Sequence, residues 1–250
     1  MYMAPTDDMQ FLIDDVLDVG TVLGKLPHYA ELGLGNELTT ALLDEAAKFA
    51  ADVVSPLRRV GDAHPARCSD SAVTIPPGYG DAIQQLGAGG WVGISAPRDQ
   101  GGQGLPELFG TAACEMWNSA DMAFALEPFL SAGAALAISA HANETLQSTY
   151  LEKIYSGEWS GTMNLTESGA GSDLGPMKTR AKREGDHYRI YGQKIYITWG
   201  DHDATDNIVH LVLARLPDAP EGSRGISLFL VPKFMVNEDG SLGERNDAYP

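Results

Sequence analysis

The residues best suited to chemistry lie in two short segments, and the first of them suits a phosphate group. Residues 162–181 (TMNLTESGAGSDLGPMKTRA) read as a β-like run followed by a turn with two glycines and two hydroxyl side chains: Thr166, Gly169, Gly171 and Ser172. Glycine lets the backbone approach a ligand and adopt positive φ, so that successive N–H groups point into one concavity and hold a phosphate. The two hydroxyl groups add donors aimed the same way.

The second segment, residues 193–200 (QKIYITWG), offers an aromatic ring and a hydroxyl. Tyr196 and Thr198 stand two apart, and in a β-strand that spacing puts both side chains on one face. The phosphate cradle, the flat ring and the hydroxyl together are the equipment of a flavin dinucleotide site. Taken alone, each feature has a commoner explanation: a tight loop for the glycines, and a strand residue packed on a core for Tyr196.

Both segments resemble one family. TESGAGSD followed by KIYITWG resembles the paired flavin-binding segments of the acyl-CoA dehydrogenases. Residues 91–106 (WVGISAPRDQGGQGLP), residues 210–233 and the opening, residues 2–26, resemble the long-chain branch that includes the 3-methylmercaptopropionyl-CoA dehydrogenases. The resemblance covers essentially the whole chain, and it implies an FAD-dependent oxidoreductase of fatty acid metabolism.

The resemblance assigns cofactor contacts only to positions that match the family motif. The residues implied to bind FAD are Met163, Leu165, Thr166, Gly171, Ser172, Tyr196 and Thr198. Gly171 and Ser172 would lie near the pyrophosphate and ribityl chain, and Ser172 would also touch the acyl-CoA. Tyr196 would stack beside the isoalloxazine ring, and the Thr198 hydroxyl would lie near flavin N5, where hydride arrives.

Three positions depart from the family pattern. Tyr196 stands where many relatives have tryptophan, Ser168 replaces a frequent proline, and Trp199 occupies a position usually held by a smaller or more polar residue. None of these changes removes a chemical group that the flavin site needs. The sequence does not indicate what Trp199 packs against.

The implied reaction is the α,β-dehydrogenation of an acyl-CoA thioester to the trans-2-enoyl-CoA. A carboxylate removes the α proton, and the β hydrogen leaves as hydride. In the family that carboxylate is a glutamate of a C-terminal helical domain, and this sequence contains no such domain. We therefore assign no catalytic residue, and we expect the N-terminal portion of a longer dehydrogenase, inactive by itself.

Other functions stay open on the sequence alone. The chain could be a non-catalytic half that binds FAD and acyl-CoA, or a subunit that needs a partner, and an acyl-CoA oxidase would share the same residues. The resemblance implies an electron-transfer flavoprotein as electron acceptor and a homo-oligomer for the full-length protein. The acyl chain length is not readable, because the candidate pocket residues are more often interhelical core: Met122, Phe124, Phe129 and Leu130.

Hydrophobic periodicity changes once along the chain and predicts an α+β fold. We expect an N-terminal helical bundle followed by an antiparallel, barrel-like β domain. The boundaries that we predict are an N-terminal extension over residues 1–34, a helical domain over residues 35–157 and a β domain over residues 158–250.

Local signals place the elements within these parts. Asn36 is suited to cap a helix that ends at Pro56, and Asn143 to cap one that Gly157 stops. Helices are also expected at residues 79–86 and 107–118. Strands are expected at residues 179–184 and 187–191, joined by a Gly185-Asp186 hairpin turn, and at residues 193–198, 208–214 and 226–231.

Composition argues against several classes of partner. Thirty-four acidic and 17 basic residues give a net charge of −17, which argues against a nucleic acid partner. Cys68 and Cys114 lie far apart, and the six histidines lack metal-ligand spacing, so we expect neither a disulfide framework nor a metal.

Residues 1–10 lack a signal peptide pattern, which favours the cytoplasm. Residues 122–142 are apolar, but Glu127 and Pro128 interrupt them, so a buried helix is favoured over a membrane span.

Three features that suggest other chemistry are set aside. The run GGQG at residues 101–104 lacks the third glycine of a dinucleotide fingerprint, because Glu107 stands there. Glu167, beside the phosphate cradle, has the chemistry of a base, but the resemblance implies that it positions its loop. His202 and Asp203 are interpreted as loop hydrogen-bonding residues.

Overall fold

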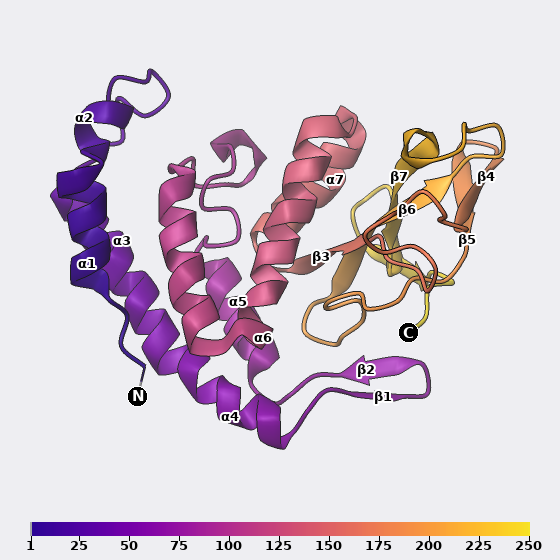
Figure 1. Ribbon diagram of the computed structural model, residues 1–250, viewed down its shortest axis with the longest axis horizontal. Helices are drawn as coiled ribbons and strands as arrows, with labels where there is room; N and C mark the ends of the chain where they lie inside the picture. Colours follow the sequence, from indigo (N-terminus) through magenta and orange to yellow (C-terminus); the bar gives the residue numbers. More distant parts are fainter. Residues whose placement is uncertain (1) are drawn as a thin grey trace.

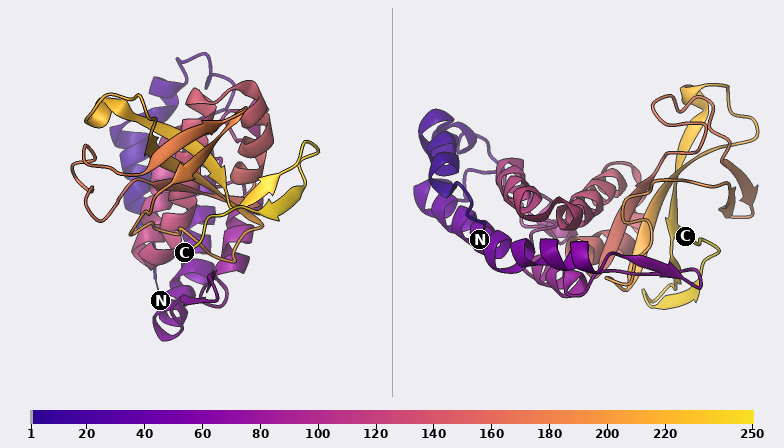
Figure 2. Two further views of the ribbon diagram at one scale, coloured as in Figure 1. Left: turned by 90° about the vertical axis from the view of Figure 1, so that its right-hand side faces the viewer. Right: turned by 60° about the horizontal axis from the view of Figure 1, so that its bottom comes forward.

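A helical half and a β half lie at opposite ends of an elongated molecule (Figures 1 and 2). The computed structural model describes residues 2–250. The long helix α6 (Glu107–His141) reaches from one half to the other, and it packs on strand β3 (Trp159–Asn164). The two halves are therefore joined through a shared packing surface.

The helical half runs to Tyr155. Besides α6, its helices are α1 (Thr6–Gln10), α2 (Val19–Leu23), α3 (Asn36–Phe49), α4 (Ser55–Ala63), α5 (Tyr79–Ala88) and α7 (Glu144–Tyr155). Two π-helical stretches, η1 (Phe11–Val16) and η2 (Ala50–Val54), and a 3-10 turn, η3 (Arg98–Gln100), lie among them. Side chains of α3, α5 and α6 form the core of this half, among them Leu43, Leu86 and Phe124.

The helix that begins at α3 does not end at Pro56, so that prediction is wrong. η2 follows α3 directly, and Pro56 lies in the first turn of α4. The backbone stays helical from α3 through η2 into α4, and the Ser55 N–H, directly before the proline, donates to the Ala50 carbonyl oxygen in the wider π-helical pattern. Asn36 is the first residue of α3 and not its cap, because Gly35 holds the cap position.

α6 unites the two helical segments that the sequence predicted separately. It is broken at Asp121, whose φ of −156° and ψ of 101° are not helical. By length and composition α6 is apolar enough to cross a membrane. In the fold it packs against α3, α4, α7 and β3, as a core helix of the bundle. Phe124 is fully buried, but Met122 and Phe129 are exposed, so the core interpretation is wrong for these two.

Local signals at the ends of α7 were read correctly. The Asn143 side chain accepts a hydrogen bond of 2.9 Å from the Leu146 N–H, as a helix cap does. Gly157 follows the helix with a left-handed φ of 73°, which few residues except glycine adopt. Both features hold α7 against β3, where Trp159 is buried.

The β half is built around β6 (Asn207–Arg215), the central strand of a five-stranded sheet. The pairing of β3 with β6 is parallel, and the pairing of β7 (Ile226–Pro232) with β6 is antiparallel. β4 (Arg180–Glu184) and β5 (His187–Tyr191) form the predicted hairpin, and β4 meets β6 at one residue pair. A 3-10 turn, η4 (Ser223–Gly225), precedes β7. Two small hairpins lie outside this sheet: β1 (Arg67–Ser69) with β2 (Ala72–Thr74), and β8 (Phe234–Val236) with β9 (Leu242–Arg245).

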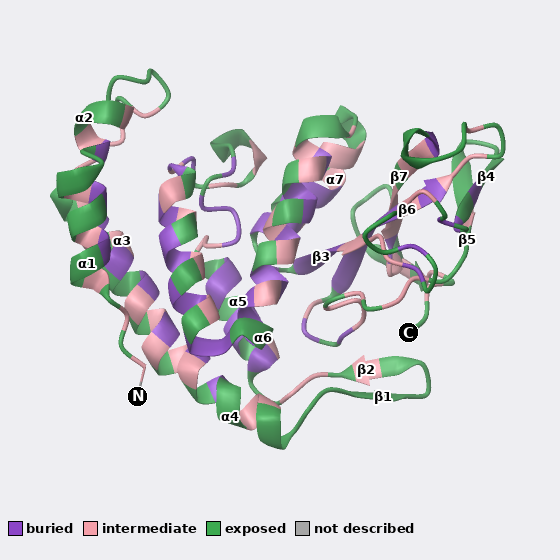
Figure 3. Ribbon diagram, viewed as in Figure 1, coloured by how far each residue is buried: buried purple, intermediate pink, exposed green. Residues whose placement is uncertain are grey.

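The fold class is confirmed as α+β, with two differences inside the β half. The sheet is mixed rather than antiparallel, because the β3–β6 pair is parallel. It also stays open within residues 2–250, because β5 ends the strand order without meeting β3. Figure 3 shows that the β4–β5 hairpin is largely exposed, as an outer edge of a sheet would be.

Candidate functional site

The predicted phosphate cradle folds as a tight bend directly after β3. Glu167 and Ala170 exchange backbone hydrogen bonds of 2.8 and 3.1 Å, which closes the bend. Gly169 and Gly171 do not take the left-handed φ that we predicted, but a Cβ atom at either position would meet nothing within 4 Å. The N–H groups of Gly171 and Ser172 have no acceptor within residues 2–250, and both residues are exposed. Open space and free donors therefore fit a phosphate group here.

A buried carboxylate anchors this bend from behind. The Glu167 side chain accepts hydrogen bonds from the N–H groups of Lys178 at 2.7 Å and Thr179 at 3.0 Å, and it pairs with the Lys194 ammonium at 3.0 Å. Burial by itself would raise the pKa of Glu167, but the hydrogen bonds from Thr179, Lys178 and Lys194 outweigh it and lower the pKa to about 2. A carboxylate so engaged positions its loop and is not available as a base.

Lys194 and its neighbour join the two predicted segments. The Lys194 ammonium also donates to the carbonyl oxygen of Leu165 at 3.0 Å. The Ile195 N–H donates to the carbonyl oxygen of Thr166 at 2.9 Å. The structure therefore brings Leu165 and Thr166 beside the start of the second segment, while Met163 lies half-buried in β3.

The second segment is not the strand that the sequence predicted. Residues 193–198 join no strand, and Tyr196 takes a left-handed φ of 56°. That φ breaks the alternation on which a shared face for Tyr196 and Thr198 depended. The side chain of Tyr196 is 90% exposed, and Thr198 is exposed as well. The Tyr196 ring is free to stack on a ligand, and the place of the Thr198 hydroxyl beside a flavin stays a prediction.

Trp199 finds its partners in the helical half. Its ring stacks on Tyr79 with centroids 6.2 Å apart, and its indole N–H donates to the carbonyl oxygen of Ala123 at 2.9 Å. The Tyr79 hydroxyl in turn donates to Asp121 at 2.6 Å. The sequence did not indicate what Trp199 packs against. In the structure its partners, Tyr79 and Ala123, lie next to the break in α6.

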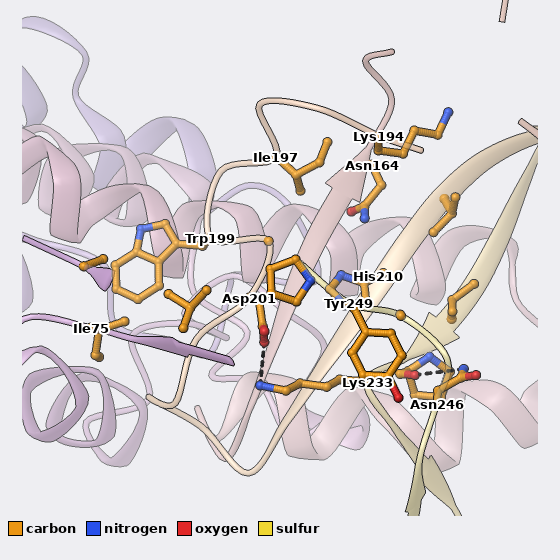
Figure 4. Close-up of a pocket in the computed structure, with 18 of the residues that line it drawn as sticks. Ile75, Asn164, Lys194, Ile197, Trp199, Asp201, His210, Lys233, Asn246 and Tyr249 are labelled. Atoms are coloured by element: carbon orange, nitrogen blue, oxygen red, sulfur yellow. Dashed lines mark hydrogen bonds and ion pairs between the residues drawn. The ribbon is translucent and has the colours of Figure 1, made fainter. Parts of the chain in front are cut away.

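A wide cleft of about 2830 Å³ opens between the helical half and the sheet (Figure 4). Its wall includes several residues that the sequence did not single out: Asn164, Lys194, Ile197, Asp201, His210 and Lys233. Tyr196 and Thr198 do not line it, although Ile197 between them does. The cleft therefore adjoins the second segment without enclosing it.

Two charged residues that line the cleft, Asp201 and Lys233, form an ion pair. Asp201 pairs with the Lys233 ammonium at 2.6 Å, and Arg245 approaches its other oxygen at 3.5 Å (Figure 4 shows the first pair). His210 contacts the Thr162 hydroxyl at 2.7 Å through Nδ1, and burial lowers the pKa of His210 to about 4. No short sequence motif marks these pairs, because their members lie on different strands and loops.

Glu127, His202 and Asp203 have structural partners. Glu127 accepts hydrogen bonds of 2.7 Å from both Ser131 and Ser160, and burial raises its pKa despite them. His202 accepts from the Ala204 N–H at 3.2 Å, and Asp203 accepts from the Ile75 N–H at 3.0 Å, as loop residues do. Across residues 2–250, no cluster of His, Cys, Asp and Glu side chains has the makings of a metal site. Cys68 and Cys114 are both free.

Fold and site together define a two-part module in which a helical bundle is joined to a sheet that carries an open, glycine-bearing bend. The chain belongs to the acyl-CoA dehydrogenase family. The model of the acyl-CoA dehydrogenase N-terminal domain matches residues 36–158, and that of the middle domain matches residues 162–247.

The chain is similar to two curated dehydrogenases and to one solved structure. The chain is 45% identical to 3-methylmercaptopropionyl-CoA dehydrogenase of Ruegeria pomeroyi over 98% of its own length and 41% of that protein. It is 36% identical to a butyryl-CoA dehydrogenase of Syntrophomonas wolfei over 99% of its length and 41% of that protein. An acyl-CoA dehydrogenase of Bacillus anthracis, solved in complex with FAD, shares the fold with a TM-score of 0.65 and 24% identity, over 81% of this chain and 32% of that one. The chain thus spans about 41% of the length of the curated relatives.

Proposed function

We propose that this chain supplies the FAD-binding N-terminal and middle domains of an enzyme that dehydrogenates a short acyl-CoA thioester to the trans-2-enoyl-CoA. The observation that carries the proposal is the junction of the two segments, where Ile195 bonds to Thr166 and Lys194 pairs with Glu167. The junction supports it because a diphosphate donor set and an exposed aromatic ring then belong to one continuous surface. Family membership and the named activities of the two relatives support the reaction class.

Each residue has a defined task in this proposal. The free N–H groups of Gly171 and Ser172 bind the diphosphate, with the Ser172 and Thr166 hydroxyl groups as further donors. Tyr196 stacks on the flat ring, and Met163 and Leu165 line its side. Glu167 and Lys194 hold the two segments at a fixed separation. When bound, FAD supplies the hydride-accepting chemistry of the reaction.

The substrate and its partners are inferred more coarsely. A short acyl group is proposed because both curated relatives are named for short acyl-CoA substrates. We further propose that the proton of the α carbon is removed by a residue outside this chain. An electron-transfer flavoprotein as acceptor and a homo-oligomeric full-length enzyme, both implied by the family, complete the proposal together with a cytoplasmic location.

Titration of the chain with FAD, followed by flavin fluorescence and visible circular dichroism, tests the cofactor site. We expect saturable quenching and an induced dichroic band. Riboflavin, which lacks the diphosphate, should bind much more weakly, because it offers no phosphate oxygens to the N–H groups of Gly171 and Ser172. Equal binding of riboflavin and FAD would contradict the assignment of the bend to a diphosphate.

Anaerobic addition of butyryl-CoA and 3-methylmercaptopropionyl-CoA to the full-length protein tests the reaction. Bleaching of the flavin band is expected for a dehydrogenase, and transfer of electrons to an electron-transfer flavoprotein should follow. Release of peroxide in air at a comparable rate would instead indicate an acyl-CoA oxidase. Binding without bleaching would indicate a non-catalytic FAD- and acyl-CoA-binding protein.

A further inference from the structure

The turn that carries Tyr196 and Thr198 has a strained backbone. Tyr196 and Trp199 both take left-handed φ values, 56° and 52°, and neither is a glycine. The Gly200 N–H closes the turn on the carbonyl oxygen of Ile197 at 3.0 Å. Such a conformation persists only where the surroundings hold it. Tyr196 is 90% exposed and gives no such hold. Ile195 is bonded to Thr166 before the turn, and within the turn the contacts to another element are those of Trp199.

Trp199 supplies that restraint from the helical half. Its indole N–H bonds to the Ala123 carbonyl oxygen at 2.9 Å, and its ring stacks on Tyr79 at an angle of 29°. Both partners are themselves fixed by Asp121. One carboxylate oxygen of Asp121 accepts the Ala123 N–H at 3.0 Å, and the other accepts the Tyr79 hydroxyl at 2.6 Å.

The break in α6 and the turn also share a surface. Asp121, Ala123, Tyr79, Ile197 and Trp199 all line the cleft between the two halves. In a straight helix, the backbone N–H and C=O groups of residue 121 would both form the regular hydrogen bonds between residues four apart. The break frees the Asp121 side chain to cap the second part of α6, and it sets the Ala123 carbonyl oxygen within reach of the indole.

We propose that Trp199 is a positioning residue, which couples the break in α6 at Asp121 to the turn that carries Tyr196 and Thr198. Its hydrogen bond to Ala123 holds the turn in its left-handed form and so sets how the Tyr196 ring and the Thr198 hydroxyl meet the cofactor. Only this last step rests on the proposed function. The hold on the turn itself is a property of the free chain.

Amide hydrogen exchange, measured by NMR on the free chain, tests the hold directly. Trp199→Phe keeps an aromatic ring against Tyr79 but lacks the N–H. We expect exchange of the Gly200 amide to accelerate about fivefold, as for the loss of one net hydrogen bond. The Ile195 amide, which is bound to Thr166, should change less than twofold. Trp117→Phe is the matched control, because the Trp117 indole N–H has no hydrogen-bond partner.

Two results would overturn the proposal. The first is Gly200 exchange in Trp199→Phe within twofold of the unmodified chain. The second is an equal acceleration in Trp117→Phe, which would make the effect global. If Trp199→Phe does not fold, benzothienylalanine at position 199 replaces only the N–H by sulfur, and the same expectation for the Gly200 amide applies.

The functional consequence has its own readout. With FAD at saturation, Trp199→Phe should change the induced visible dichroism of the flavin and weaken binding about fivefold, while Trp117→Phe should do neither. An unchanged dichroic band and affinity would overturn the link between Trp199 and the cofactor. Failure of the unmodified chain to bind FAD would contradict the proposed function instead, and the exchange rates would still decide whether Trp199 holds the turn.

Discussion

The two segments of the candidate site are held in opposite ways. The bend after β3 is fixed from inside by a buried carboxylate, since Glu167 engages two backbone N–H groups and the Lys194 ammonium. The turn at residues 196–199 has no buried anchor of its own and depends on Trp199, while Tyr196 projects into solvent. In the proposed site, the phosphate side would therefore be preorganised by the chain, whereas the ring side would gain its remaining contacts from the ligand.

Removal of the buried anchor should have the largest effect. Glu167→Ala leaves the Lys194 ammonium, whose side chain is 8% exposed, without its counter-charge. We expect the free energy of unfolding to fall by about 3 kcal/mol, as is typical when one partner of a buried pair is removed. Urea denaturation measures it. Glu221→Ala, at an exposed position, should cost less than about 0.5 kcal/mol. A loss below about 1 kcal/mol for Glu167→Ala would show that the bend does not depend on its carboxylate.

Acid should lower the free energy of unfolding in two successive pH windows. Burial lowers the pKa of His202 and His210 from 6.5 to about 4, so the unfolded chain takes up their protons first. Their contribution is complete above pH 6.5 and is lost as the pH falls towards 4, by roughly 2–3 kcal/mol for each. The pKa of Glu167 is lowered from 4.5 to about 2, so its contribution to the free energy of unfolding is complete above pH 4.5 and is lost as the pH falls from 4.5 to 2.

Urea midpoints at a series of pH values measure both windows. His210→Gln should flatten the decline between pH 6.5 and 4, and Glu167→Gln should flatten only the part below pH 4.5. A profile that is level from pH 7 to 4 would contradict the buried, neutral state of the two histidines.

Truncation of the exposed ring should separate binding from stability. Tyr196→Ala should leave the free energy of unfolding within about 0.5 kcal/mol, because the side chain is 90% exposed. FAD affinity should fall about fivefold, the usual size of one lost aromatic contact. Fluorescence titration provides the measurement, and Tyr196→Trp should bind at least as tightly as the unmodified chain. An Ala variant with unchanged affinity would remove Tyr196 from the site.

The smallest effect on stability is expected in the bend itself. Gly171→Ala puts a methyl group into open space without a left-handed φ, so the unfolding free energy should change by less than about 0.5 kcal/mol. Gly222→Ala, also in open space but with φ of 77°, should cost about 1 kcal/mol in thermal or urea unfolding. FAD binding should weaken in Gly171→Ala alone. Weakening in both variants would place the diphosphate elsewhere.

Sequence patterns succeeded where a structure is decided by neighbours along the chain. The cap at Asn143, the stop at Gly157 and the hairpin at Gly185 are local, and all three were predicted correctly. The mixed order of the sheet was not predictable in this way, because the β3–β6 pair joins residues 159–164 to residues 207–212. Residue spacing carries no information about such a pairing.

The site divides along the same line. The bend and the exposed tyrosine could be found from residue types, and Glu167 and Lys194 both lie within the two segments that were singled out. The prediction of a strand over residues 193–198 was wrong. Apolar alternation produces a strand only where a partner strand is present, and here the Ile195 N–H bonds to a loop. The partners of Trp199 lie far back in the sequence, at Tyr79 and Ala123, and only the fold connects them.

The central place of β6 has a consequence for synthesis on the ribosome. β6 pairs with β3, which precedes it in the chain, and with β7, which follows it. The central strand therefore cannot have both partners until Pro232, the last residue of β7, has left the exit tunnel. The helices up to Tyr155 pack on one another, as α3 and α4 do on α6, and all of them precede the strands of the main sheet in the chain. They can therefore fold while the later codons are still being read. β3 can then pack on α6 before β6, its partner in the sheet, has been synthesised.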